Sequence, residues 1–228
     1  MRAVIVAGGE VDPTDRRLLQ GADLVIGADA GALTLLGWGV RPDVVVGDLD
    51  SLGPRRVEDL RKAGARIDAH LAEKDETDTE LAIRHAAQDG ADDIVVLGAL
   101  GGARVDHALA NVLILADEML GRGVRLVRGH VSIEALRGGA TLELAAAAGS
   151  LVTLLPLGGD AEGVRTEGLR YALDGGTLRL GSPRGTSNVI ESVPARVAID
   201  RGILLVIETA RVSDAEAGAS ASRTSPEP

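Results

Sequence analysis

The sequence predicts an α/β fold, in which a Rossmann-like, mostly parallel sheet with helices on both faces is followed by a small β-sandwich domain. The first observation is an alternation of short apolar runs with helical patterns through residues 1–129, which is typical of parallel strands joined by helices. The second is a change near residue 130, after which the apolar runs are short, rich in Val, Leu and Thr, and separated by glycines. Such runs, without a helical period, are typical of antiparallel sandwiches.

The strands of the first half are predicted from apolar runs that are continuous rather than alternating. Continuous runs belong to strands that are buried on both faces of a sheet. Segments between them place apolar residues at helical spacing and predict helices. The predicted strands are 3–8, 23–28, 43–48, 65–70, 93–99 and 124–129, and the clearest helices are 54–64, 77–90 and 106–123.

The second half and the end of the chain complete the domain prediction. Residues 211–228 are mainly Ala, Ser, Glu and Pro without an apolar period, so they are predicted to form a disordered tail. The sequence therefore predicts two domains, 1–129 and 130–210, and a tail over 211–228. The short runs of the second domain are 132–139, 141–145, 150–159, 163–168, 168–176, 177–182, 195–200 and 203–209.

Charge and composition exclude several classes of partner. Lys and Arg total 24 against 34 Asp and Glu, a formal net charge of −10, so we expect neither nucleic acid nor an anionic membrane as a partner. We expect no transmembrane helix and no secretory signal, because the apolar runs are too short for either. The chain has no cysteine, which excludes disulfides and thiolate metal sites and fits a reducing, cytoplasmic location.

Carboxylates follow two of the predicted strands. Asp48 and Asp50 come at the end of the third strand, with Ser51 behind them, and Asp29 follows the second. Asp and Ser are common in turns, and a single Asp also fits a helix N-cap. Two carboxylates at the end of an apolar strand, however, fit the oxygen ligands that Mg²⁺ prefers. Ligands of doubly wound sheets bind beyond the carboxyl ends of the strands, so all four residues are candidates for a ligand site.

A second acidic turn precedes the second predicted helix. Thr77 and Glu80 make a capping box, which explains Thr77 on structural grounds alone. The box does not explain why Lys74, Asp75 and Asp78 crowd into the same turn. Their charges fit a site that holds both a cation and a phosphate.

The segment GALGGARVDHALAN, residues 98–111, joins a strand to a helix through glycines. Glycines such as Gly102 let backbone N–H groups approach a phosphate at a helix N-terminus, and Arg104 is suited to bind phosphoryl oxygens. Asp106 also fits the role of an N-cap. Together with the carboxylates, these features predict Mg²⁺-dependent phosphate chemistry without a Walker loop, which the chain lacks.

Four motifs in order resemble those of the thiamine pyrophosphokinase family. They are PDVVVGDLDSL, KDETDTELA, GALGGARVDHALAN and the later GLRYAL with GTSNVIE, and the resemblance extends from about residue 3 to residue 209. It implies transfer of a pyrophosphoryl group from ATP to the hydroxyl of thiamine, giving thiamine diphosphate and AMP, with Mg²⁺. It also implies a catalytic domain that binds ATP and Mg²⁺, a second domain that binds thiamine, and a homodimer whose active sites lie between subunits.

The residue patterns and the resemblance together assign a role to each candidate. The sequence departs from the family's pattern in two places: Asp29 is followed by Ala30 where the family usually has a second glycine, and the glycine–arginine motif carries one residue more than the commoner form. Tyr171 fits either stacking on thiamine or packing in the domain core, and Ser187 with Asn188 also fits a β-turn. The catalytic candidates are Asp48, Asp50, Asp78 and Asp106, of which the first three are expected metal ligands; the ATP-binding candidates are Asp29, Ser51, Lys74, Thr77, Gly102 and Arg104; the thiamine-binding candidates are Tyr171, Ser187 and Asn188.

Two other functions compete with this interpretation. One is a pyrophosphokinase of the same kind that acts on another hydroxyalkyl heterocycle, such as a pterin. The other is a non-catalytic, nucleotide-sensing protein that keeps the fold. The acidic residues at every matched position favour an enzyme, and the motif GTSN favours thiamine by resemblance.

Overall fold

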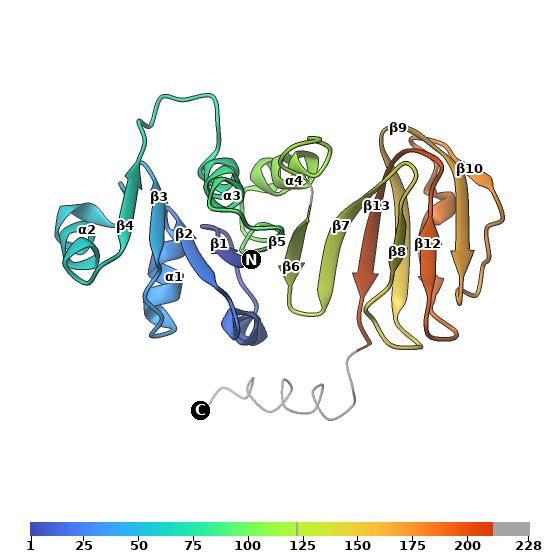
Figure 1. The fold of residues 1–228 in the computed structure, drawn as a ribbon, viewed down its shortest axis with the longest axis horizontal. Coiled ribbons are helices and arrows are strands. Elements are labelled where there is room, and N and C mark those ends of the chain that lie inside the picture. Colours follow the sequence, from blue (N-terminus) through green and yellow to red (C-terminus); the bar gives the residue numbers. More distant parts are fainter. Residues whose placement is uncertain (122, 212–228) are drawn as a thin grey trace, which may run out of the picture. The chain divides into compact units, whose positions relative to one another are not determined.

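The computed structural model describes residues 1–121 and 123–211, and the chain divides into two compact units, Met1–Ala135 and Leu136–Pro228 (Figure 1). The first unit holds a parallel sheet with its helices, and the second is built of antiparallel strands, which confirms the predicted fold class. The predicted tail, apart from its first residue, lies outside the described residues. Within the described part of the chain, no helix is long and apolar enough to cross a membrane.

Six parallel strands form the sheet of the first unit in the order β4-β3-β2-β1-β5-β6. The four inner strands are almost wholly buried, as their continuous apolar runs predict. The strand that follows β6 runs antiparallel to it. The bounds are β1 Arg2–Val6, β2 Leu24–Ala28, β3 Val44–Gly47, β4 Arg66–Ala69, β5 Asp93–Leu97, β6 Val124–Arg128 and β7 Val131–Arg137.

Helices cover both faces of this sheet. On one face, Leu35 packs with Val4 in one apolar cluster and Leu60 packs with Val45 in another. Alternate residues of these strands point to the opposite face of the sheet. There α3 (Asp78–Gln88) packs against β1, β2 and β3, and its Ile83 is fully buried. The helices are the 3₁₀ helix η1 (Pro13–Leu19), α1 (Gly31–Gly37), α2 (Gly53–Lys62), α3 (Asp78–Gln88) and α4 (Val105–Ile114).

The helices differ from the prediction in two ways. The helix expected over 106–123 ends at Ile114. Beyond it, Asp117 Oδ1 accepts hydrogen bonds of 2.8 Å from the backbone N–H groups of Met119 and Leu120, and such a side-chain contact favours a turn over a helix. The sequence does not predict η1 or α1, because each is only seven residues long, which is too short to display a helical period.

The strand order creates a switch point between β1 and β5. From β1 the chain adds β2, β3 and β4 on one side, and then returns to place β5 on the other side of β1. The connections that follow β1 and β5 therefore lead to strands on opposite sides of this point, and a crevice forms at such a point, beyond the carboxyl ends of the strands. The topology alone selects this edge as the place where a ligand binds.

The second unit is organised around one long strand, β9 (Leu151–Glu167), which pairs with four shorter antiparallel strands. The first half of β9 pairs mainly with β13 and β11, and the second half pairs with β12 and β10. Gly158 and Gly163 adopt φ values of 76° and 68°, which lets the strand change direction. The sequence predicts two separate strands here, because these glycines resemble turn residues. The other elements are β8 Thr141–Glu143, β10 Gly176–Leu178, β11 Asn188–Val189, β12 Arg196–Ala198, β13 Arg201–Thr209 and the 3₁₀ helix η2 Pro183–Gly185.

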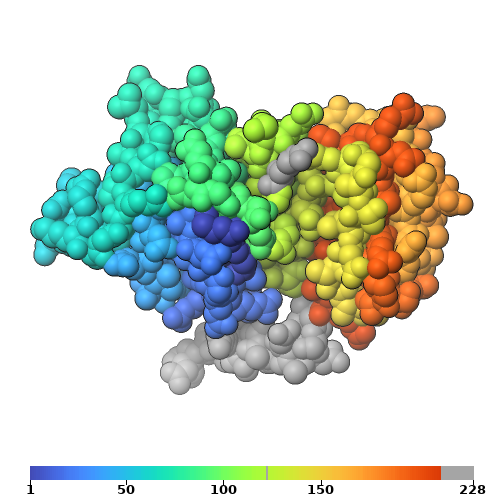
Figure 2. All heavy atoms as spheres, in the orientation of Figure 1, coloured from blue at the N-terminus to red at the C-terminus, as the bar shows by residue number. Residues whose placement is uncertain are grey.

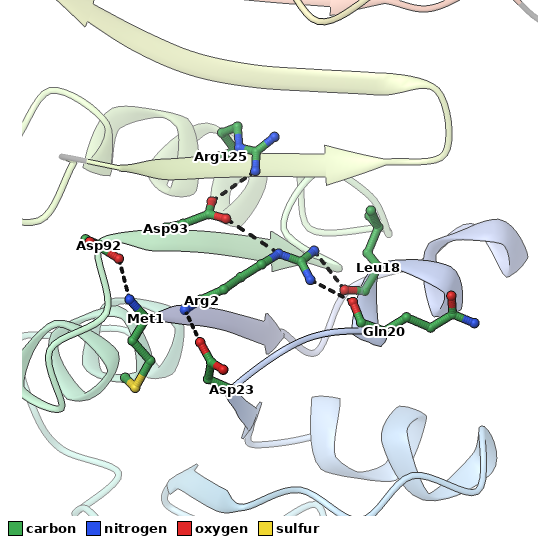
Figure 3. Close-up of polar contacts among 8 residues, drawn as sticks. All are labelled: Met1, Arg2, Leu18, Gln20, Asp23, Asp92, Asp93 and Arg125. Carbon is green, nitrogen blue, oxygen red and sulfur yellow. Dashed lines mark hydrogen bonds and ion pairs between the residues drawn. The ribbon is translucent and has the colours of Figure 1, made fainter.

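Arg2, at the start of β1, ties the amino-terminal edge of the sheet together (Figure 3). Its guanidinium donates hydrogen bonds of 2.9 Å to the backbone carbonyls of Leu18 and Gln20 at the end of η1. Its Nε lies 3.5 Å from Asp93, which in turn accepts a 2.9 Å bond from Arg125. One side chain thus connects η1, β5 and β6 to the central strand.

We expect Arg2→Met to lower the free energy of unfolding by about 1–2 kcal/mol, because two backbone carbonyls lose charged donors while the apolar stem stays. Arg2→Lys should recover little of this loss, since one ammonium cannot reproduce the planar fork. Urea denaturation measures both. Arg61→Met is the matched control, because Arg61 pairs with Glu58 on the exposed side of α2 and surface pairs stabilise little. Equal losses for Arg2→Met and Arg61→Met would contradict this role.

Candidate active site

A cavity of about 750 Å³ lies at the switch-point edge, and all its lining residues belong to the first unit. The loops after β1, β2 and β5 form part of it, and the loop between β4 and α3 forms another part. Figure 2 shows this last loop, in teal, projecting from the surface of the first unit. The lining consists of residues 7–10, 28–30, 72, 74–79, 98, 99, 101–104, Asp48, His107, Ala108 and Asn111.

Two glycine loops meet at the wall of this cavity. The backbone N–H of Gly9 donates to the carbonyl of Gly98 at 3.0 Å, and that of Glu10 donates to the carbonyl of Gly101 at 3.3 Å. A Cβ at residue 9 would overlap both carbonyls, so only glycine permits the contact. This leaves bare backbone beside the cavity, where a phosphate can approach closely.

Three carboxylates converge at the ends of β2 and β3. Asp29, Asp48 and Asp78 each offer an oxygen, and these oxygens lie within 4.8 Å of one another. Asp29 has a positive φ of 44°, which is uncommon for a residue other than glycine. Gly47 makes room for the group, because a Cβ there would lie 3.1 Å from the carboxylate of Asp78. The backbone at two strand ends is therefore shaped around this acidic group.

The chemistry of the acidic group fits a hard cation. Asp29 Oδ1 is buried and has no hydrogen-bond partner within the described part of the chain, and a buried charged oxygen left in that state is costly. Mg²⁺ and Ca²⁺ prefer oxygen ligands of this kind. Lys74 partly balances the charge, since its Nζ lies 2.7 Å from Asp78 Oδ1 and its side chain is 14% exposed. The residues present thus suit a divalent cation.

Asp50 and Ser51 lie in the turn that follows β3, and neither lines the cavity. Ser51 Oγ donates to Asp29 Oδ2 at 2.7 Å and lies 3.2 Å from Asp50 Oδ1. The backbone N–H of Asp50 also donates to Asp48 Oδ1 at 3.2 Å. The structure therefore places Asp50 beside the three-carboxylate group, linked to it by Ser51, but not within it.

Thr77 and Asp78 begin α3. Thr77 Oγ1 accepts a 3.1 Å hydrogen bond from the backbone N–H of Glu80, so the N-cap predicted from the sequence forms. The Glu80 side chain pairs with Arg84 at 2.7 Å instead. The cap fixes the first turn of α3, and this turn directs Asp78 toward the other two carboxylates.

Arg104 and Asp106 form an exposed pair at the start of α4. The guanidinium donates to the carboxylate at 2.7–3.2 Å, and both side chains are more than 60% exposed. This contact lowers the pKa of Asp106 to about 2, so the carboxylate is charged at neutral pH. Arg104 and Gly102 line the cavity, whereas Asp106 does not.

The second unit brings the three thiamine-binding candidates together. Tyr171 stands on the loop between β9 and β10 with 65% of its surface exposed, which excludes the alternative that it packs in the core. Ser187 has a positive φ of 58°. Asn188 is buried, and its amide contacts the backbone of Tyr171.

Several cavity residues are not among the sequence candidates, and Asn111, Glu10 and His107 are three of them. Asn111 is buried on α4 and donates a 3.0 Å hydrogen bond to the carbonyl of Ala99, which attaches α4 to the loop after β5. The signal in the sequence is an asparagine within an otherwise apolar helical stretch. Glu10 pairs with Arg128 at 2.8 Å and does not stand out in the sequence. His107 lies on the exposed first turn of α4, and the sequence, where it follows Asp106, assigns it no role.

Comparisons with known proteins agree on one family. The family model "Thiamin pyrophosphokinase, catalytic domain" matches residues 16–126, and "Thiamin pyrophosphokinase, vitamin B1 binding domain" matches residues 141–204. Thiamine pyrophosphokinase of Bacillus subtilis is 29% identical over 187 residues, which cover 82% of this chain and 87% of the relative. Thiamine pyrophosphokinase 1 of Oryza sativa subsp. japonica is 31% identical over 176 residues, covering 73% and 66%. The crystal structure of the Bacillus subtilis protein matches with a TM-score of 0.81 at 28% identity, covering 93% of this chain and 100% of that one.

Proposed function

The chain belongs to the thiamin pyrophosphokinase family, and on that premise we propose how its residues transfer pyrophosphate from ATP to thiamine. The enzyme gives thiamine diphosphate and AMP. The observation that carries the assignment is the match of both family models, in order, to the two units. Neither the pterin-specific nor the nucleotide-sensing alternative has support of this kind.

Asp29, Asp48 and Asp78 would hold Mg²⁺, with Asp50 joining them through a rotation of its exposed side chain. Two observations support this arrangement: the convergence of three carboxylate oxygens and the unpartnered, buried Asp29 Oδ1. When bound, the cation neutralises phosphate charge, which is the main requirement of phosphoryl transfer. Ser51 keeps Asp29 oriented through its 2.7 Å hydrogen bond.

The glycine loops, Lys74 and Arg104 would bind the ATP phosphates. Arg104 lines the cavity, and its partner Asp106 restrains the Arg104 guanidinium beside Gly102. Asp106 thus contributes to catalysis by orienting Arg104. Lys74 would turn from Asp78 toward the phosphates once a metal ion occupies the acidic group. Thr77 sets the start of α3 and so the position of Asp78.

Lys74 and a divalent cation compete for the same carboxylate, so we expect Lys74→Met to bind Mg²⁺ about tenfold more tightly in the absence of nucleotide, equivalent to about 1.4 kcal/mol. The same change should raise the KM for ATP, because a phosphate-binding charge is lost. Isothermal titration with MgCl₂ measures the first effect. Lys62→Met, at an exposed site on α2, controls for the change in net charge. Unchanged or weaker Mg²⁺ binding in Lys74→Met would overturn the proposed competition.

We further propose that the enzyme is a homodimer in which the second unit of one subunit serves the cavity of the other. Every residue that lines the cavity belongs to the first unit, whereas the thiamine-binding candidates Tyr171, Ser187 and Asn188 belong to the second, so the proposed site needs a contribution from a second unit. An exposed apolar stripe on α4 supports a protein contact close to the cavity; Val105, Leu109 and Leu113 are 67%, 61% and 58% exposed. A cytoplasmic location accords with the absence of cysteine from the sequence.

The release of AMP shows which acceptor the enzyme uses. The protein with ATP and MgCl₂ is supplied with thiamine, with a hydroxymethylpterin or with no acceptor, and AMP is measured by chromatography. We expect release with thiamine alone. Release with the pterin alone would favour the other acceptor class, and binding of ATP with no release in any mixture would favour a sensing role.

A further inference from the structure

The side-chain amide of Asn188 forms hydrogen bonds with the backbone of the protein itself. The residue is 6% exposed. Its Oδ1 accepts hydrogen bonds from the backbone N–H groups of Tyr171 at 3.0 Å and Val189 at 2.9 Å, and its Nδ2 donates to the carbonyl of Tyr171 at 2.8 Å. An asparagine amide offers two donors and two acceptor positions, so three of the four are occupied. Both polar groups of the Tyr171 backbone are held by this one side chain.

The loop that carries Tyr171 is fastened on both sides of that residue. On one side, Leu169 forms a β-bridge with Ile190. On the other, the backbone of Leu173 exchanges two 2.9 Å hydrogen bonds with Thr166, through its N–H to Oγ1 and through its carbonyl to the backbone N–H. Asn188 completes the attachment in between, so the ring of Tyr171 is exposed while its backbone is fixed.

A strained residue directs Asn188 inward. Ser187, immediately before it, adopts a φ of 58°, and its backbone N–H donates to Thr153 Oγ1 at 3.1 Å. Asn188 and Val189 then pair with β9 as the short strand β11. A non-glycine residue in this conformation is strained, and such strain persists where surrounding contacts determine it. Here the strained turn at Ser187 places the Asn188 amide against the backbone of the exposed Tyr171.

We propose that Asn188 is a positioning residue for thiamine, which acts by clamping the backbone of Tyr171 and not by touching the heterocycle. The proposal rests on the function proposed for the second unit and gives Asn188 a role different from the one that the family resemblance implies. A ring held before the ligand arrives loses less conformational entropy on binding. Removal of the clamp therefore weakens thiamine binding and leaves ATP binding unchanged.

The clamp itself is tested without any assay of activity. Tyr171 is the only tyrosine in the sequence, so protein labelled with 3-fluorotyrosine gives one ¹⁹F resonance. In Asn188→Ala the resonance should sharpen and move toward that of the free amino acid. Ser150→Ala, which removes a buried hydrogen bond to the backbone of Arg211 in the same unit, should leave it unchanged. An unchanged resonance in folded Asn188→Ala would overturn the clamp, whether or not the enzyme uses thiamine.

A double-mutant cycle tests whether Asn188 acts on thiamine binding through Tyr171. Asn188→Ala should raise the KM for thiamine by about three- to thirtyfold, within the limit set by loss of the whole ring, with the KM for ATP unchanged. In the Tyr171→Ala background the same change should add less than about twofold. Asn188→Asp, which keeps the acceptor but loses the donor, provides a second variant if the first folds poorly. Equal fold-changes in both backgrounds would mean that Asn188 acts independently of Tyr171, and the proposal would fail.

Discussion

Asp48→Asn should lower kcat by about a hundredfold or more, the scale observed when a preorganised electrostatic group is removed. Asp48 supplies one of three carboxylates whose oxygens lie within 4.8 Å of one another, and an amide oxygen is a much weaker ligand for Mg²⁺ than a carboxylate. Stability without Mg²⁺ should be unchanged or higher, because the substitution relieves repulsion while the new side chain still accepts the hydrogen bond from Asp50. Steady-state kinetics and thermal melts measure the two effects.

The metal dependence of the melts separates a ligand from a merely structural residue. The wild-type midpoint should rise with MgCl₂, because a ligand that binds only the folded state stabilises it, and the midpoint of Asp48→Asn should not. Asp59→Asn, on the exposed side of α2, has the same change in net charge and should behave as wild type. Near-normal turnover in Asp48→Asn, or an intact response to Mg²⁺, would rule out the assignment.

Tyr171→Ala should raise the KM for thiamine by about ten- to a hundredfold, the range for loss of an aromatic face that stacks on a base. Tyr171→Phe should be nearly silent, because the ring remains. Tyr171 is 65% exposed, so removal of its ring leaves no cavity in the core and should hardly change the melting temperature. A fall in stability with unchanged KM would instead mark Tyr171 as a structural residue.

Mixed dimers test whether this ring serves the partner subunit. Tyr171→Ala and Asp48→Asn subunits are unfolded and refolded together, and activity is assayed at a thiamine concentration where each parent is nearly inactive. In a hybrid dimer, one of the two shared sites receives both intact halves, so a statistical mixture should recover about a quarter of wild-type activity. If native mass spectrometry detects hybrids while activity stays at the level of the parents, the two halves of a site come from one chain.

The sequence predicts the parallel sheet well because the relevant signal is local. Each inner strand is a continuous apolar run, and burial on both faces requires such a run. It predicts the second unit less well, since Gly158 and Gly163 bend the single strand β9, whereas glycines at such positions are typical of a turn between two strands. The seven residues of α1, bracketed by glycines, are too few to display a helical period.

The residues of the candidate site also divide into those with a local signal in the sequence and those without one. Asp48 and Asp78 are identifiable as candidates because each stands at the boundary of an element with an apolar pattern. The membership of Asp29 in their group depends on β2 and β3 being neighbours and on the positive φ of Asp29, neither of which the sequence displays. Asn188 is recognisable as a site residue by resemblance, yet its contact with Tyr171 depends on the path of a loop 17 residues away in the chain.

³¹P NMR of the reaction mixture shows directly whether a pyrophosphoryl group moves intact from ATP to thiamine. With wild-type protein, MgCl₂, ATP and thiamine, we expect AMP and thiamine diphosphate to appear in equal amounts, with no ADP and no thiamine monophosphate. Accumulation of ADP together with thiamine monophosphate would mean transfer of a single phosphoryl group, and would contradict the proposed pyrophosphoryl transfer.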